Sequence, residues 1–184
     1  MKIRLTLAAA AALALAACGS QEEAAAPAAD DPSAVPTPVA QTPDTSTPQG
    51  FVDTMAASDM YEVEAAKLAQ EMGTSAKVKD FAEMMIKDHT ASSDKLGVAV
   101  AAAGNGLAVA PELTPSLQQN LDALKAAGDR FDQVYAQQQV AAHQDALALL
   151  KRQAETGTVE QLKTFAKETA AVVQGHLDHA RELP

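Results

Sequence analysis

Tryptophan is absent from this chain of 184 residues, the other aromatic residues are rare, and cysteine occurs once. A single cysteine excludes an internal disulfide and a zinc site built from several thiolates. Basic residues are also few, with 14 Lys and Arg against 24 Asp and Glu, and the net charge is −10. Because phosphate binding needs clustered positive charge, we expect no nucleic acid among the partners of this protein.

Strand patterns and familiar catalytic motifs are missing as well. No run alternates β-branched or aromatic residues with polar ones, so the sequence predicts an all-α protein. We find no nucleophile constellation and no glycine-rich phosphate loop. The sequence therefore does not favour an enzyme.

The first eighteen residues have the parts of a secretory signal. Lys2 and Arg4 precede a short apolar stretch, and Leu15-Ala16-Ala17 stands directly before Cys18. The stretch is too short to span a membrane, and a lone thiol has no disulfide partner. The segment resembles a bacterial lipoprotein signal, which implies that residues 1–17 are removed and that Cys18 is lipidated. Because Gly19-Ser20 lacks an aspartate, we expect an outer-membrane lipid anchor with the domain in the periplasm.

Residues 18–50 are predicted to form a disordered tether after the lipidated cysteine. Six of the nine prolines lie in this segment, mixed with Ala, Thr, Ser, Gln and Asp. Such a composition cannot bury an apolar core. The tether would let the domain reach protein partners in the envelope, whose identity the sequence leaves open.

Residues 51–184 read as one helical domain. Apolar residues recur at spacings of three and four. The expected helices span residues 51–72, 75–103, 114–127, 129–157 and 158–183. Four long helices and one short helix in the crossover predict a ferritin-like four-helix bundle made of two helical hairpins. A repeat at an offset of 84 residues supports the two hairpins, since Gly73-Thr74 is matched by Gly157-Thr158.

Each long helix carries one titratable residue in or beside its apolar stripe. These residues are Glu62, His89, His143 and His176. Imidazole nitrogen and carboxylate oxygen are ligands for divalent transition metals, and bundle interiors hold such sites. Asp59, Asp88 and Asp145 are candidates to orient the rings from outside the ligand set. The alternative is a buried polar cluster whose members satisfy one another, or bind water, without metal.

Two smaller metal hypotheses accompany this one. Met85 lies four residues before His89, and a Met–His pair would suit copper, although methionine at helical spacing is usually core. His176 and His179 are one turn apart and could chelate at the surface. The ordinary interpretation of His179 is a solvated residue near a helix C-terminus.

Together these features resemble an exported bacterial family known as domain of unknown function 4142, often labelled predicted outer-membrane proteins. The segments that carry the resemblance are residues 51–68, 84–89, 131–150 and 165–177. The resemblance implies a ferritin-like helical fold and implies no activity. Di-iron carboxylate proteins use Glu-x-x-His pairs. Here no acidic residue lies three positions before His89, His143 or His176, which argues against that chemistry.

Three functions remain open from the sequence, and the third, a metalloenzyme, is the least favoured because the Glu-x-x-His pairs are missing. The first is a lipid-anchored, non-catalytic envelope or binding protein. The second is a metal-binding sensor, buffer or redox protein that uses the interior His and Glu residues.

Overall fold

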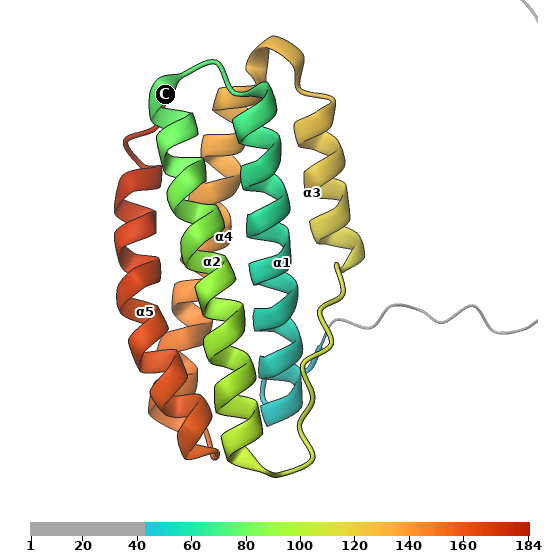
Figure 1. Ribbon diagram of the computed structural model, residues 1–184, viewed down its shortest axis with the longest axis vertical. Helices are drawn as coiled ribbons and strands as arrows, with labels where there is room; N and C mark the ends of the chain where they lie inside the picture. Colours follow the sequence, from blue (N-terminus) through green and yellow to red (C-terminus); the bar gives the residue numbers. More distant parts are fainter. Residues whose placement is uncertain (1–42) are drawn as a thin grey trace, which may run out of the picture. The chain divides into compact units, whose positions relative to one another are not determined.

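A computed structural model describes residues 43–184, and in this part of the chain all regular structure is helical. The predicted all-α class is therefore confirmed. The expectations for the signal peptide, for Cys18 and for most of the tether concern residues 1–42 and lie outside the described residues. Four long helices lie side by side and the shorter α3 flanks them (Figure 1). The helices are α1 (Pro48–Met72), α2 (Ala76–Ala103), α3 (Pro115–Lys125), α4 (Phe131–Thr156) and α5 (Glu160–Ala180), with a 3-10 turn at Gly128–Arg130 before α4.

Helix α1 begins at Pro48, three residues earlier than the sequence pattern indicated. Thr47 is its N-cap, and the side chain of Thr47 accepts a hydrogen bond from the Gly50 amide. Proline fits the first turn because it has no N–H to leave unpaired. The last residues that we assigned to the tether therefore belong to the helical domain.

Two short turns join α1 to α2 and α4 to α5. Gly73 ends α1 and Gly157 ends α4, both in an extended backbone conformation with closely similar angles. The amide of Gly73 donates to the carbonyl of Ala69, and the amide of Gly157 donates to that of Gln153. A side chain at either glycine would overlap the carbonyl oxygen that its own amide contacts. These matching turns support the two hairpins expected from the sequence repeat.

The two hairpins are tied together at the start of α4. The carboxylate of Asp132 accepts hydrogen bonds from the amides of Thr74 and Ser75 at 3.0 and 2.8 Å. Ser75 is the N-cap of α2 but makes no capping bond with its own side chain. Asp132 thus fixes the start of α2 from another helix. Burial opposes the charge of this carboxyl, but hydrogen bonds from the Thr74 hydroxyl and from the two amides hold its pKa below the usual range.

The apolar core is divided into two parts. One part contains Phe51, Leu96, Leu150 and Phe165, and the other contains Tyr61, Phe81, Leu124 and Tyr135. In addition to these two apolar parts, the interior contains buried polar residues from all four long helices. They include Asp59, Glu62, His89, Gln139, His143 and His176. We call these six residues the polar layer.

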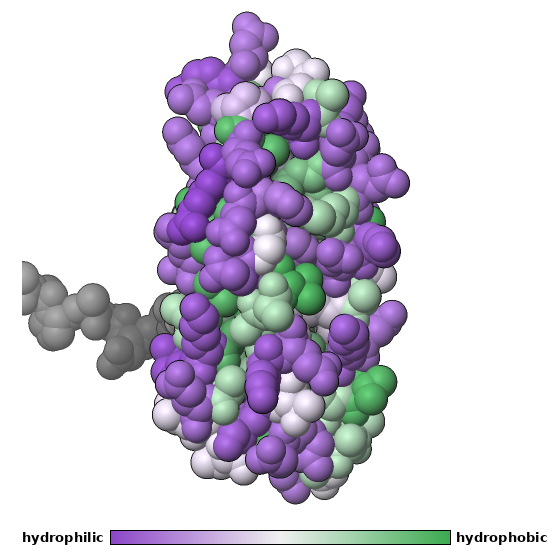
Figure 2. Space-filling view, turned by 90° about the vertical axis from the view of Figure 1, so that its left-hand side faces the viewer, coloured by the Kyte–Doolittle hydropathy of each residue, from purple (hydrophilic) through white to green (hydrophobic). Residues whose placement is uncertain are grey.

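The surface of the domain is mainly polar. Hydrophilic residues cover most of the face to which α5 contributes (Figure 2). Among the described residues the large apolar side chains that are exposed are few, and they are Met60, Val98, Val109 and Val172. None of the helices described here is both long and apolar enough to span a bilayer.

The hairpin turns generate the first prediction. Gly73→Ala should lower the free energy of unfolding by about 1–2 kcal/mol, because the new Cβ would overlap the Ala69 carbonyl. Gly97→Ala within α2 should raise it by about 0.5–1 kcal/mol, because Gly97 has open space around its Cα and alanine is the better helix former. Urea unfolding followed by circular dichroism measures both changes. Equal effects of the two substitutions would contradict the close approach at the turn.

Candidate metal centre

Three imidazole rings from three different helices meet in the polar layer. His89 comes from α2, His143 from α4 and His176 from α5, and their ring centroids lie 5.4–5.7 Å apart. All three side chains are buried, with exposed fractions of 6%, 1% and 3%. One nitrogen of each ring lies within 4.8 Å of the corresponding nitrogens of the other two. The structure thus brings together the three histidines that the sequence analysis singled out.

Two of the rings are held by carboxylates on neighbouring helices. His89 Nδ1 lies 2.8 Å from Asp59 Oδ1 on α1, and His176 Nε2 lies 3.0 Å from Asp88 Oδ2 on α2. Asp88 and His89 are consecutive in sequence, and successive helical positions point in different directions. Helix α2 can therefore supply a ring to the centre and a carboxylate to α5. Two of the three aspartates that we expected to orient the rings occupy such positions.

The third ring is held by a backbone group that the sequence analysis missed. His143 Nδ1 lies 2.8 Å from the carbonyl oxygen of Gln139, one turn earlier on α4. A carbonyl can only accept, so the proton of the neutral ring sits on Nδ1 and Nε2 carries a lone pair. Residue type gives no sign of this contact, because any residue four positions earlier offers the same carbonyl.

The nitrogens that remain have no partner. His89 Nε2, His143 Nε2 and His176 Nδ1 are buried and make no hydrogen bond to any described residue. A buried polar atom without a partner costs about 1–3 kcal/mol, so a group of three is unusual. If the ring nitrogens that face Asp59, Asp88 and Gln139 donate, the three free nitrogens all present lone pairs. These three nitrogens therefore make no hydrogen bonds to one another.

Burial and charge set the protonation of the three rings. Burial, helped by the neighbouring His89, lowers the pKa of His143 to about 3. Burial also lowers the pKa of His176, although the hydrogen bond to Asp88 opposes it. Burial opposes protonation of His89 too, but the hydrogen bond to Asp59 and the charges of Glu62 and Asp88 outweigh it and raise the pKa. His143 and His176 are therefore the rings most readily kept neutral, the form that binds metal.

Glu62 lies beside the three rings and outside the group of converging nitrogens. Its Oε1 is 3.8 Å from Nδ1 of His143, the nitrogen that faces the Gln139 carbonyl. Its Oε2 accepts a hydrogen bond of 2.7 Å from the side-chain amide of Gln139. Burial raises the pKa of Glu62 to about 7, while His89 and Gln139 act in the opposite direction. Glu62 was expected among the ligands, and the structure places its carboxylate beside Nδ1 of His143.

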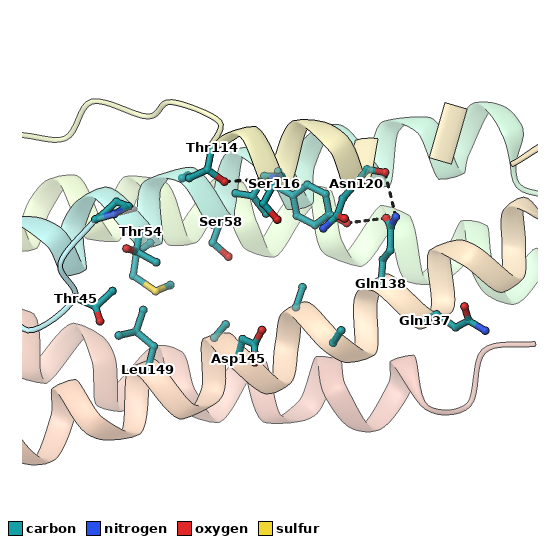
Figure 3. Close-up of a pocket in the computed structure, with 18 of the residues that line it drawn as sticks. Thr45, Thr54, Ser58, Thr114, Ser116, Asn120, Gln137, Gln138, Asp145 and Leu149 are labelled. Carbon is teal, nitrogen blue, oxygen red and sulfur yellow. Dashed lines mark hydrogen bonds between the residues drawn. The ribbon is translucent and has the colours of Figure 1, made fainter. Parts of the chain in front are cut away.

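Asp145 does not contact the rings. It is exposed and lines a separate groove between α1, α3 and α4, together with Ser58, Ser116 and Asn120 (Figure 3). The groove has a volume of about 660 Å³. At one end Gln138 bridges the helices, since it accepts a bond from Tyr61 and donates to the Asn120 carbonyl. The expected role of Asp145 behind the rings has no contact to support it.

The arrangement suits a transition-metal ion. The three unpartnered donors are imidazole nitrogens, which favour zinc, copper, iron, cobalt or nickel over calcium and magnesium. A ring nitrogen that binds metal usually has its other nitrogen hydrogen-bonded to a carboxylate or a carbonyl, as all three rings have here. His179 is not part of the group of converging donors, and Met85 is buried in the apolar core.

Comparison with known proteins identifies the family and no more. The family described as domain of unknown function (DUF4142) matches residues 33–183, which confirms the family expected from the sequence. No curated protein and no solved structure matches the chain.

The buried carboxyl of Glu62 generates the second prediction. Glu62 ionises at pH 4.5 when unfolded and near pH 7 when folded, so the folded state binds more protons between these values. Stability contributed by this group is therefore present below pH 4.5 and is lost as the pH rises to about 7. In metal-free protein, Glu62→Gln should gain about 1–3 kcal/mol of unfolding free energy relative to wild type across this window.

Urea unfolding at several pH values measures the difference, and Glu83→Gln is the control, because Glu83 is exposed on α2. A constant difference between Glu62→Gln and wild type from pH 4.5 to 7 would show that Glu62 titrates normally.

Proposed function

The chain belongs to the DUF4142 family, and on that premise we propose that it is a metal-binding protein of the cell envelope. One divalent transition-metal ion is bound by His89, His143 and His176. Two observations carry this proposal: one nitrogen of each ring lies within 4.8 Å of a nitrogen of each other ring, and each ring has one buried nitrogen with no partner among the described residues. The protein acts as a metal sensor, buffer or redox protein, roles that all begin with stoichiometric binding.

The contacts behind the rings support metal binding more strongly than the rings alone. Asp59, Asp88 and the Gln139 carbonyl each fix the orientation of one ring. A histidine that is buried for packing alone needs one partner for each polar nitrogen, and here each ring has a partner on only one side. A single ion would satisfy three lone pairs at once.

A centre for one ion fits these residues better than a pair of irons. Carboxylate-bridged di-iron sites take Glu-x-x-His from two helices. Among the residues of the group of converging donors there is no carboxylate. The proposed centre therefore differs from a ferritin di-iron site. For the fold itself we still propose a ferritin-like bundle of two helical hairpins. Close packing of α1 on α2 and of α4 on α5 supports that arrangement.

Attachment to the outer membrane completes the proposal. The sequence of residues 1–18 is the basis for this attachment. Acyl chains on Cys18 hold the protein at the membrane, and the helical domain lies in the periplasm. A tether before the domain would let it meet metal ions and envelope proteins within the reach of the anchor. An acidic protein gains little from anionic lipid headgroups, so the acyl chains supply the attachment.

Metal content is the third prediction. The full chain, purified without a metal-affinity tag or chelator and then incubated with zinc or cobalt, should contain about one ion per chain by elemental analysis. His143→Ala should lose the bound ion, because removal of one of three ligands leaves two. Asp59→Asn should keep the site but bind zinc about 10- to 100-fold more weakly, since the hydrogen bond to His89 is altered.

His179→Ala is the matched control, because His179 is exposed on the same helix as His176. Circular dichroism must show that each variant remains helical. Zinc should also raise the Tm of wild type and not of His143→Ala, because an ion that binds only the folded state stabilises it. Absence of metal from wild type under all these conditions would leave the three rings as a polar cluster and refute the proposal.

Membrane attachment is the fourth prediction. In cells fed labelled palmitate, the wild-type protein should carry the label and sediment with the outer membrane. Cys18→Ala should carry none and should lose its membrane association. Recovery of both proteins in the soluble fraction would refute lipid attachment without bearing on the metal centre.

A further inference from the structure

The proposed centre has fewer protein ligands than a zinc-type ion requires. Transition-metal ions of this class take at least four ligands, and three protein ligands with one further position are typical of open sites. The group of converging donors among the described residues consists of three histidines. The nearest carboxylates, Asp59 and Asp88, are already engaged on the far nitrogens of His89 and His176. One coordination position is therefore left over.

Further buried polar atoms without a hydrogen-bond partner among the described residues belong to Ser92, Tyr135 and Gln139, and Ser92 is the one on α2, the helix of His89. The hydroxyl of Ser92 is buried and makes no hydrogen bond to any described residue. Ser92 follows His89 by three residues in α2, so both side chains lie on the same interior face, about 5–6 Å apart at Cβ. A metal–water–hydroxyl chain spans about 5 Å, from a metal–oxygen bond of about 2.1 Å and a hydrogen bond of about 2.8 Å.

We infer that the fourth position of the three-histidine centre is open to a water molecule or a small anion, and that Ser92 hydrogen-bonds to this ligand. This inference rests on the proposed function. Ser92 is a positioning residue that contacts the exogenous ligand and does not coordinate the metal, which is bound by the three histidines. Burial of all three rings restricts the ligand to a few atoms, which excludes a large substrate from the metal.

Glu62 is the competing occupant of the fourth position. Its carboxylate is buried beside His143, and release from Gln139 would free it to move. In the structure it is on the Nδ1 side of His143, whereas the unpartnered nitrogen of that ring is Nε2. A carboxylate ligand would close the site, so exogenous anions distinguish the two arrangements.

Cobalt(II) bound to the full chain tests the inference, because its visible absorption reports the ligands directly. Titration of the cobalt protein with azide at constant pH should change the visible spectrum with a single saturating curve. Ser92→Ala should bind cobalt as wild type does and bind azide about tenfold more weakly, because one hydrogen bond to a charged ligand is lost.

Two further variants separate a hydrogen bond from a packing effect. Ser92→Thr keeps the hydroxyl and should restore azide affinity. A control outside serine is Thr90→Ala, because Thr90 is exposed on the same helix and its hydroxyl bonds to the Ile86 carbonyl, and the azide affinity of this variant should equal that of wild type. Equal azide affinity of wild type and Ser92→Ala would overturn the role of Ser92.

The outcomes for the centre itself are distinct. Failure of wild type to bind cobalt would refute the proposed function and this inference together. Cobalt binding with no response to azide would overturn the open position and leave the proposed function intact. If Glu62→Gln then became responsive to azide, Glu62 would be the fourth ligand.

Discussion

Burial of a polar layer inside a helical domain is the constraint on which the rest of this structure depends. Six polar residues from four helices lie in the interior, apart from the two apolar regions of the core. Each buried polar atom must find a partner or cost about 1–3 kcal/mol. The helices must therefore meet in a register that lets Asp59 reach His89, Asp88 reach His176 and Gln139 reach Glu62. A shift by one residue on any helix would break these contacts.

The hairpin turns and the link through Asp132 help to maintain that register. A glycine at each turn allows the backbone to leave the helix where a side chain would collide with a carbonyl. Asp132 then ties the first turn to the start of α4, so the hairpin of α1 and α2 is fixed against the next long helix. Alanine is abundant among the buried residues of α1, and small side chains allow helices to approach closely. These features explain why the rings, which come from distant parts of the chain, can meet.

The sequence predicts the helices and the three histidines, because both follow from spacing along one helix. Helix boundaries agree within a few residues, except that Thr47 and Pro48 start α1 earlier than the apolar pattern alone indicates. The roles of Asp59 and Asp88 were also within reach of the sequence, since each lies near a histidine or its neighbour in the stripe. The positions of Glu62 and Asp145 were not. Both depend on how α1 and α4 are rotated against their neighbours, and single-helix periodicity carries no information about that rotation.

Charge balance gives a reason why the proposed ion should be divalent. The three proposed ligands would bind an ion as neutral imidazoles, so they would cancel none of its charge in a buried site. Asp59 and Asp88 each accept a hydrogen bond from a ligand ring and together bring two negative charges next to the centre. Two carboxylates balance a doubly charged ion, whereas a singly charged ion would leave an excess of negative charge. Glu62, whose pKa burial raises to about 7, can lose its proton when an ion of higher charge needs further compensation. The same residues that orient the rings thus also set the charge that the centre tolerates.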